Sequence, residues 1–118
     1  MRPHKKLELW KFVIEFVSGI YKLTKEFPIE ERYGLTSQIK RASVSVASNI
    51  AEGAARKSAK EKTQFFSISK GSLSEIDAQL EIALTLQFIN ESEYNTNIEK
   101  LDRISRMLQG LVTHYEKT

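Results

Sequence analysis

The chain has 118 residues, enough for one domain that buries about two-thirds of the surface exposed by its unfolded form. It contains no cysteine, which excludes disulfides, thiolate metal sites and cysteine nucleophiles and favours a reducing, cytoplasmic location. The net charge is only +3. No uncharged run approaches the ~20 apolar residues that cross a bilayer, and no apolar signal-peptide segment follows the first basic residues, so we expect a soluble protein without a membrane partner.

The charges form two opposite blocks along the sequence. Residues 32–70 hold eight Lys or Arg and two Glu, a net charge of +6. Residues 71–99 hold six acidic residues and no basic one, a net charge of −6. The near-neutral total therefore conceals a strong asymmetry.

Helical periodicity begins near the start of the chain. At about 100° per residue, the apolar side chains between Leu9 and Phe27 fill one broad arc and the charged ones fill the rest. This pattern predicts an amphipathic helix over about residues 6–26. Pro28 ends it, because the residue before a proline is pushed out of the α region.

The stretch VSVASNIAEGAA, residues 44–55, alternates like a strand only at its first three positions. Apolar and small residues recur through it at alternating spacings of four and three, which places them on one face of a helix and favours a helix over about residues 35–56. We call this face the seam; its positions are Leu35, Ile39, Ala42, Val46, Asn49 and Gly53. Small side chains surround this helix on nearly every side. We infer that one face of this helix packs against the other helices of the chain and that a second face packs against another subunit. The alternative is a tightly packed helix in a monomer.

Two helix starts mark the rest of the chain. Ser58 and Glu61 predict a capping box that opens a helix over about residues 59–88, and Asn90 and Glu93 open another over about residues 91–115. Gly71, in mid-helix, predicts close approach of another backbone. Because the links are short, consecutive helices should be antiparallel. The sequence predicts an all-α fold, an antiparallel up-down four-helix bundle that forms a single domain over residues 1–118.

Three motifs carry a resemblance to a known family: FPIEERYGLTSQIKRA (27–42), SNIAEG (48–53) and GSLSEIDAQLEIA (71–83). Together they resemble the four-helix-bundle proteins encoded in intervening sequences of bacterial 23S ribosomal RNA genes. The resemblance implies a bundle that assembles as a homopentameric ring. It also implies a fold shared with accessory proteins of diversity-generating retroelements, basic pentamers that bind a reverse transcriptase and nucleic acid. This chain is less basic than those relatives and has Ala47 where the family often has proline.

The residues give little support to an enzyme. His4 and His114 stand in no metal-ligand spacing, and a solvated or terminal side chain explains each of them. Ser43, Ser45 and Ser48 have no suitable base nearby in sequence and no nucleophile-elbow pattern around them. We therefore expect no catalytic residue, metal, cofactor or small-molecule substrate.

A polar group in the second helix is the candidate for an oligomer or register contact: Ser45, Ser48, Asn49, Glu52 and Gly53. An amide on the seam needs a partner, since a buried unpaired one costs ~1 to 3 kcal/mol. Asn49 and Glu52 could fix helix register or a subunit contact. An ordinary intrahelical pair on a half-exposed face is the alternative.

The basic block supplies the candidate nucleic-acid-binding residues: Lys40, Arg41, Arg56, Lys57, Lys60 and Lys62. Repeated around a ring, they would attract phosphate without reading sequence. The favoured function is a non-enzymatic oligomeric scaffold that binds a structured RNA or a nucleic-acid-processing protein. In the alternative, a structural or protein-binding homo-oligomer, the +6 block of one subunit faces the −6 block of the next.

Overall fold

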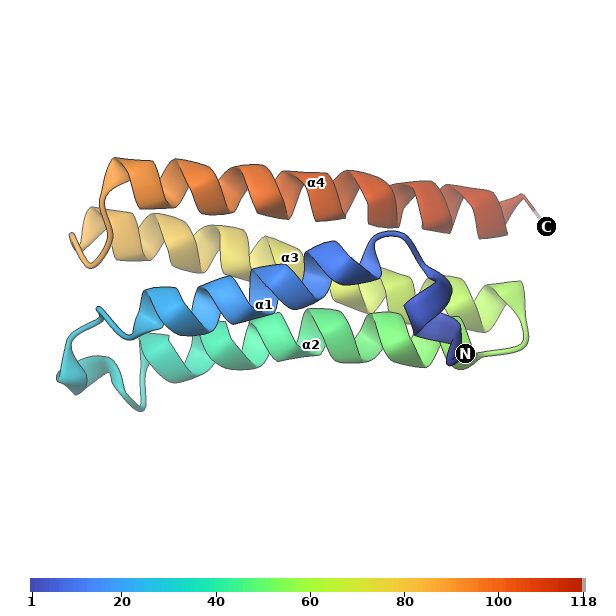
Figure 1. Ribbon diagram of the computed structural model, residues 1–118, viewed down its shortest axis with the longest axis horizontal. Coiled ribbons are helices and arrows are strands. Elements are labelled where there is room, and N and C mark those ends of the chain that lie inside the picture. Colours follow the sequence, from blue (N-terminus) through green and yellow to red (C-terminus); the bar gives the residue numbers. More distant parts are fainter. Residues whose placement is uncertain (118) are drawn as a thin grey trace.

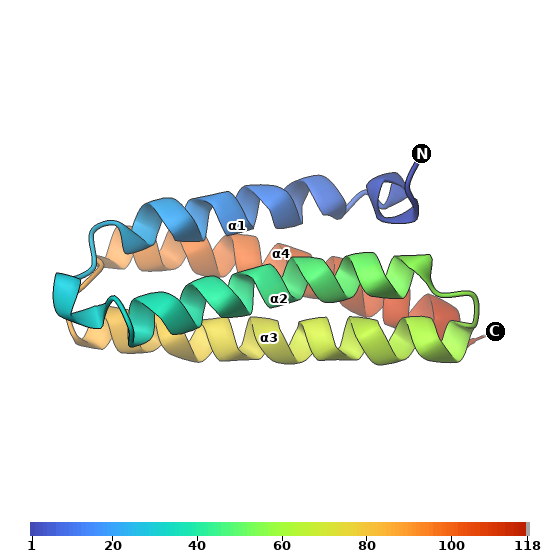
Figure 2. The ribbon, with the colours of Figure 1, turned by 90° about the horizontal axis from the view of Figure 1, so that it is seen from below.

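The computed structural model describes residues 1–117, which form four α-helices and two short 3-10 helices. The α-helices are α1 (Trp10–Thr24), α2 (Leu35–Ala55), α3 (Ala59–Thr85) and α4 (Glu91–Glu116), and the 3-10 helices are η1 (Pro3–Lys6) and η2 (Ile29–Glu31). Consecutive helices lie side by side and antiparallel (Figure 1, Figure 2). The fold is an all-α, up-down four-helix bundle, as predicted, with extents of 45 × 23 × 22 Å.

One hydrophobic core runs along the bundle axis, and every α-helix contributes to it. Phe16, Ile50, Phe66 and Leu108, one from each helix, are fully buried. They stand in the apolar stripes that recur every three to four residues, the spacing that places side chains on one face of a helix. Within residues 1–117, no helix combines the length and apolarity needed to cross a membrane.

The first helix starts later than predicted, at Trp10 instead of about residue 6. Leu7 has an extended backbone, with φ −78° and ψ 129°, so η1 is a separate segment. The His4 ring lies 4.4 Å from the Trp10 ring, and η1 packs on α2. These tertiary contacts, which periodicity does not encode, turn the N-terminal segment away from the axis of α1.

The third helix ends at Thr85, three residues before the predicted end. Gln87 adopts a left-handed conformation with φ 64°. The Phe88 amide donates to the Ala83 carbonyl (2.8 Å), and the Gln87 amide donates to the Leu84 carbonyl (3.0 Å). This is the Schellman arrangement, in which glycine usually occupies the left-handed position.

Side-chain caps open the last two α-helices. Asn90 and Glu93 form the predicted capping box, with bonds of 2.8 and 2.9 Å. The Ser58 hydroxyl accepts a bond from the Glu61 amide (3.1 Å), while the Glu61 carboxylate accepts from the Ser58 hydroxyl instead of the backbone amide. The cap at Ser58 is therefore half of the predicted box.

The second and third helices pack closely because Gly53 has no side chain. A Cβ on Gly53 would lie 2.8 Å from Phe66 Cε1, closer than real Cβ contacts. The Ser69 hydroxyl donates to the Val46 carbonyl at 2.7 Å and ties the helices again near their middle. The prediction for Gly71 is wrong: a Cβ there would meet nothing within 4 Å, because Gly71 lies on the outer side of α3.

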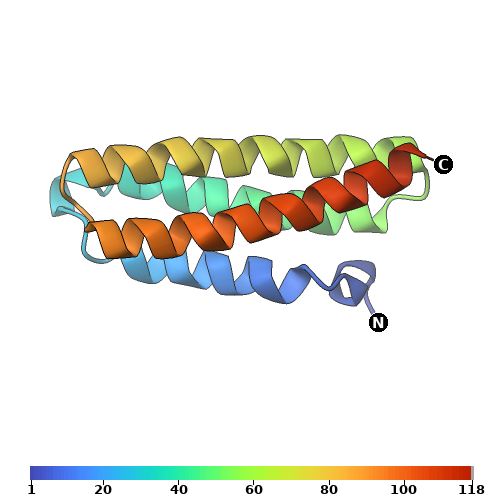
Figure 3. The same cartoon turned by 90° about the horizontal axis from the view of Figure 1, so that it is seen from above.

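The last helix separates from the first along its length. In Figure 3, α4 starts near the C-terminal end of α1 and crosses towards α3. Phe12 of α1 and Arg103 of α4 line a hollow of about 170 Å³ between the two helices. The Arg103 guanidinium lies 5.0 Å and the Lys11 ammonium 5.2 Å from the ring of Phe12, which is half-buried at the edge of the core.

Candidate nucleic-acid interface

The turn between α2 and α3 gathers four of the predicted basic residues within seven positions, Arg56, Lys57, Lys60 and Lys62. Arg56 leaves α2 in an extended conformation, and Ser58 caps α3 two residues later. The close packing at Gly53 permits so short a turn. These four side chains consequently emerge at one end of the bundle.

Two of these four residues have partners inside the chain. Arg56 pairs with Glu52 at 2.8 Å, and its guanidinium lies 4.8 Å from the Phe65 ring. The Lys62 ammonium donates to the Ala54 carbonyl at 3.0 Å and satisfies one acceptor at the C-terminal end of α2. Arg56 and Lys62 therefore stabilise the turn as well as adding charge.

The other two, Lys57 and Lys60, are exposed and make no ion pair within residues 1–117. Their ammonium groups are held only by their own flexible stems. A phosphate could approach them without breaking an existing contact, which makes them the accessible part of the turn.

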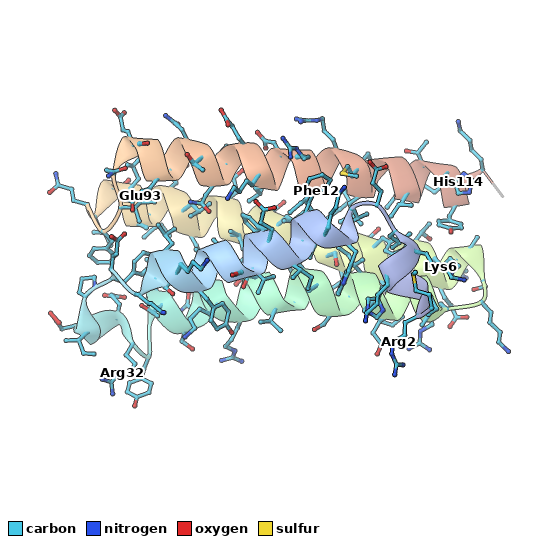
Figure 4. All side chains as sticks on the ribbon, viewed as in Figure 1. Arg2, Lys6, Phe12, Arg32, Glu93 and His114 are labelled. Atoms are coloured by element: carbon cyan, nitrogen blue, oxygen red, sulfur yellow. The ribbon has the colours of Figure 1, made fainter. Side chains whose placement is uncertain are left out.

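The N-terminal segment adds basic residues that the sequence reading did not include. Because η1 folds onto α2, Arg2 and Lys6 lie at the end of the bundle that carries the α2–α3 turn (Figure 4), and Lys5 lies between them in sequence. We call this group the basic end, which comprises Arg2, Lys5, Lys6, Arg56, Lys57, Lys60 and Lys62. Only Glu8, Glu52 and Glu61 accompany these seven residues in segments 1–8 and 52–62. Lys5 and Lys6 gave only a weak sequence signal for this site, because the predicted helix over about residues 6–26 did not show that they fold back onto α2.

The remaining two predicted residues lie elsewhere. Lys40 sits beside α1, with its ammonium 4.7 Å from the Tyr21 ring. Arg41 lines a hollow of about 330 Å³ with Glu75 of α3. Fifteen helical residues separate Arg41 from Arg56, about 22 Å at 1.5 Å per residue. The structure therefore divides the predicted set into two groups.

The candidate contact residues also separate. The Ser45 hydroxyl bonds that of Ser72 at 2.9 Å, and Gly53 packs on Phe66, so these two residues set α2 against α3 within the chain. The Asn49 amide donates to the Ser45 carbonyl (2.9 Å) and hydroxyl (3.1 Å).

Asn49 and Glu52 make separate contacts, since Glu52 pairs with Arg56. The buried position of the seam is Ile50, which is 0% exposed, while Asn49 is half-buried beside it. The other predicted seam positions, Leu35, Ile39, Ala42, Val46 and Gly53, are buried, so the strict heptad spacing is one residue too early only at this turn. Ser48 is exposed on the outer side of α2.

Acidic residues gather at the opposite end. Glu26 at the end of α1 and Glu93 at the start of α4 share a hollow of about 520 Å³. A hydrogen bond with the Glu93 side chain, followed by repulsion between the two carboxylates and a small loss of hydration, raises the pKa of Glu26. Figure 4 shows Glu93 far from Arg2 and Lys6. This end also carries Lys25 and Arg32, so its charge is mixed, whereas basic residues predominate at the basic end.

The described residues offer no metal centre. Within residues 1–117, no three His, Cys, Asp or Glu side chains are grouped so that they could hold a metal ion. The two histidines make ring contacts, His4 with Trp10 at 4.4 Å and His114 with Tyr115 at 4.8 Å. Both imidazoles are thus placed by neighbouring aromatic side chains.

With this geometry in hand, comparison with known proteins identifies the family. The model of the 23S rRNA-intervening sequence protein family matches residues 5–110. The chain belongs to this family. No curated protein matches it.

A solved structure supports the fold independently. This similar structure is that of a protein of unknown function from the S23 ribosomal protein family of Bacteroides thetaiotaomicron VPI-5482, solved at 1.70 Å. The two chains share 21% sequence identity and superpose with a TM-score of 0.83. The superposition covers 89% of this chain and 95% of the relative. The length and arrangement of the bundle are therefore common to both proteins.

Proposed function

We propose that this family member is a non-enzymatic oligomeric scaffold that binds structured RNA through the basic end. One observation carries the proposal: η1 and the α2–α3 turn, about fifty residues apart in sequence, bring seven basic side chains to one end of the bundle. The other end holds carboxylates, among them Glu26 and Glu93, together with Lys25 and Arg32. A polyanion approaching the protein would be attracted to the basic end more than to the other end.

The chemistry of the basic end favours phosphate over bases. Lys57 and Lys60 offer ammonium groups without competing carboxylates, which suits contacts with a phosphate backbone. Two aromatic rings beside the turn are half-buried: Phe65 lies 4.8 Å from the Arg56 guanidinium, and Tyr115 lies 5.5 Å from the Lys62 ammonium. Binding of this kind reads shape and charge instead of base sequence.

Assembly would multiply this effect. A ring of this chain, a homopentamer in the form expected from the family resemblance, with bundle axes parallel to the ring axis would present every basic end on the same face. Several weak phosphate contacts would then act together on one RNA, so the ring would bind more tightly than a single chain. We also propose that the protein acts in the cytoplasm.

Fluorescence anisotropy with a structured RNA tests the proposal. We expect the affinity of the native protein to fall with salt, with a slope in log–log form of about 0.7 to 0.9 per phosphate neutralised. Lys57→Glu/Lys60→Glu should abolish binding without disturbing the fold. The matched control, Lys22→Glu/Arg106→Glu, makes the same charge change at exposed positions outside the basic end and should retain most of the binding. Equal loss in both variants would contradict a localised interface.

The alternative is a structural or protein-binding homo-oligomer whose charges are used between subunits. It is favoured by exposed apolar side chains on α2 and α3, among them Val44 and Ile68. Absence of RNA binding at low salt, from protein shown to be assembled, would support this alternative and refute the RNA proposal.

A further inference from the structure

Large exposed apolar side chains occur on three of the four α-helices and at the α1–α2 link. Apart from the first residue, those in residues 1–117 come from α1, the α1–α2 link, α2 and the α3 segment, and α4 contributes none: Ile14, Tyr21, Ile29, Tyr33, Val44, Ile68, Ile82 and Leu86. Single exposed apolar residues are ordinary on a monomer. Four of them are paired locally: Ile29 and Tyr33 share the α1–α2 link, and Ile82 and Leu86 share one hollow on α3. Such local apolar groups are candidates for contact with another protein.

The most exposed of these residues form a projection at the α1–α2 link. Ile29 is 68% exposed and Tyr33 is 88% exposed. The Arg32 guanidinium lies 5.9 Å from the Tyr33 ring and points away from the bundle (Figure 4). We call Ile29, Arg32 and Tyr33 the knob. Tyr and Arg are the residue types that contribute most to binding at protein interfaces.

The backbone holds the knob in place. The Glu31 amide donates to the Pro28 carbonyl (2.9 Å), and the Gly34 amide donates to the Glu31 carbonyl (2.9 Å). The Glu31 carboxylate accepts a bond from the Leu35 amide at 3.1 Å and so anchors the link to the start of α2. A projection that is already ordered loses little conformational entropy when it binds.

The outer side of α3 carries a shallow hollow of about 340 Å³. Its lining combines apolar and small side chains with one carboxylate: Ala78, Glu81, Ile82, Thr85 and Leu86. Ile82 is 48% exposed and Leu86 is 54% exposed, so its apolar lining faces solvent. Glu81 makes no ion pair within residues 1–117. The hollow therefore suits an apolar group accompanied by a cation.

The knob and the hollow lie at the same end of the bundle. The α1–α2 link and the C-terminal end of α3 both lie at the left in Figures 1 and 2, opposite the basic end. A rotation about an axis parallel to the bundle leaves each segment at its own height. It can therefore bring the knob of one copy against the hollow of the next and repeat until a ring closes.

We propose that the knob of one copy of this chain docks into the α3 hollow of a second copy, with Arg32 facing Glu81. This inference rests on the oligomeric part of the proposed function and deepens it, because it names the two surfaces that meet. One pair of side chains supports a second copy as the occupant: within residues 1–117, Arg32 of the knob and Glu81 of the hollow each make no ion pair. The contact is heterologous, since each copy uses a different surface towards each neighbour.

Size-exclusion chromatography with light scattering tests the contact on the full chain. Native protein should be oligomeric, and Ile82→Lys should be monomeric at the same concentration. Ile14→Lys is the matched control, because Ile14 is also 48% exposed but lies on α1, outside both surfaces, and this variant should stay oligomeric. Circular dichroism must show that both variants remain folded.

Charge exchange tests the proposed pairing. Arg32→Glu should raise the dissociation constant of the oligomer by about tenfold or more, since two carboxylates would then face each other. Arg32→Glu/Glu81→Arg should recover most of that loss, which a merely structural effect of either change would not produce.

Mixing identifies the direction of assembly. Ile29→Ser/Tyr33→Ser lacks a knob, and Ile82→Lys lacks a hollow. Each variant alone should be monomeric, and an equal mixture should form dimers and nothing larger, because only one knob and one hollow remain intact.

Two outcomes separate the proposals. A monomeric native protein would overturn both this contact and the oligomeric part of the proposed function. An oligomeric native protein whose size is unchanged by Ile82→Lys and by Ile29→Ser/Tyr33→Ser would overturn this contact alone.

Discussion

A pair of glycine substitutions tests how closely α2 and α3 pack. In Gly53→Ala the new methyl group would lie 2.8 and 2.9 Å from two ring carbons of Phe66 and 3.1 Å from Phe65 Cβ. Phe66 is 0% exposed, so its ring has no free space to move into. Gly110 offers the control, because a Cβ there would meet nothing within 4 Å.

The magnitude follows from two opposing effects. Replacing glycine with alanine inside a helix gains about 0.5–1 kcal/mol at either position. Overpacking a filled core costs about 1–3 kcal/mol and applies at Gly53 alone. Gly110→Ala should therefore be more stable than the native protein, and Gly53→Ala should be less stable than Gly110→Ala by about 1–3 kcal/mol.

Urea and thermal unfolding followed by circular dichroism would measure this difference. With an unfolding entropy of about 2.1 cal/mol/K per residue, 1–3 kcal/mol corresponds to a difference in Tm of roughly 4–12 °C for a chain of this length. If Gly53→Ala proved as stable as Gly110→Ala, the close approach of α2 to Phe66 would be refuted.

Three further predictions concern the helix ends. Gln87→Gly should raise stability by about 1 kcal/mol, because glycine adopts the left-handed conformation of φ 64° without strain; an unchanged Tm would contradict this. Asn90→Ala should cost about 1 kcal/mol in urea unfolding through loss of the capping box, whereas Asn90→Ser should retain most of it; equal losses would rule out the cap as the cause. The pKa of Glu26 is raised in the folded state, so the stability of the native protein should fall as pH rises from 4.5 through the raised value. Glu26→Gln should flatten this decline in urea midpoints measured across the same pH range. If the native protein and the variant gave parallel curves, the Glu93 contact would be excluded.

Much of the fold could be predicted because its determinants are local. The apolar stripes, Pro28 and the caps at Ser58 and Asn90 define four helices within a few residues of their observed ends. The errors arise where contacts distant in sequence decide. Because η1 packs on α2, the first helix begins at Trp10 instead of about residue 6. Gln87 adopts a left-handed conformation that its residue type does not predict, so the third helix ends early.

The candidate site was predicted less completely for the same reason. Arg56, Lys57, Lys60 and Lys62 follow one another along the chain, so composition alone finds them. Arg2, Lys5 and Lys6 join them only through the tertiary position of η1. Conversely, Lys40 and Arg41 belong to the same block of sequence but lie beside α1 and Glu75, because a helix separates residues by length as well as by angle.

The polar bonds of the seam required three-dimensional information. The α2 sequence indicates that Ser45 and Asn49 need partners, but Ser72 stands 27 residues after Ser45. Which of several small polar residues meet depends on the register of α2 against α3. Gly53 and Phe66 set that register through their shapes, which periodicity alone cannot resolve.

The short links between consecutive helices also shape how the chain folds. Each helix packs mainly against its neighbours in sequence, so the loops that must close are short and the entropic barrier to closing them is small. Bundles with such local topology fold within microseconds to milliseconds. The α2–α3 hairpin joins the most closely packed pair through the shortest turn, with Ser58 as its cap, and should form the nucleus on which α4 and then α1 assemble. Newly made chains would thus reach the folded state quickly, before their exposed apolar residues meet other unfolded chains.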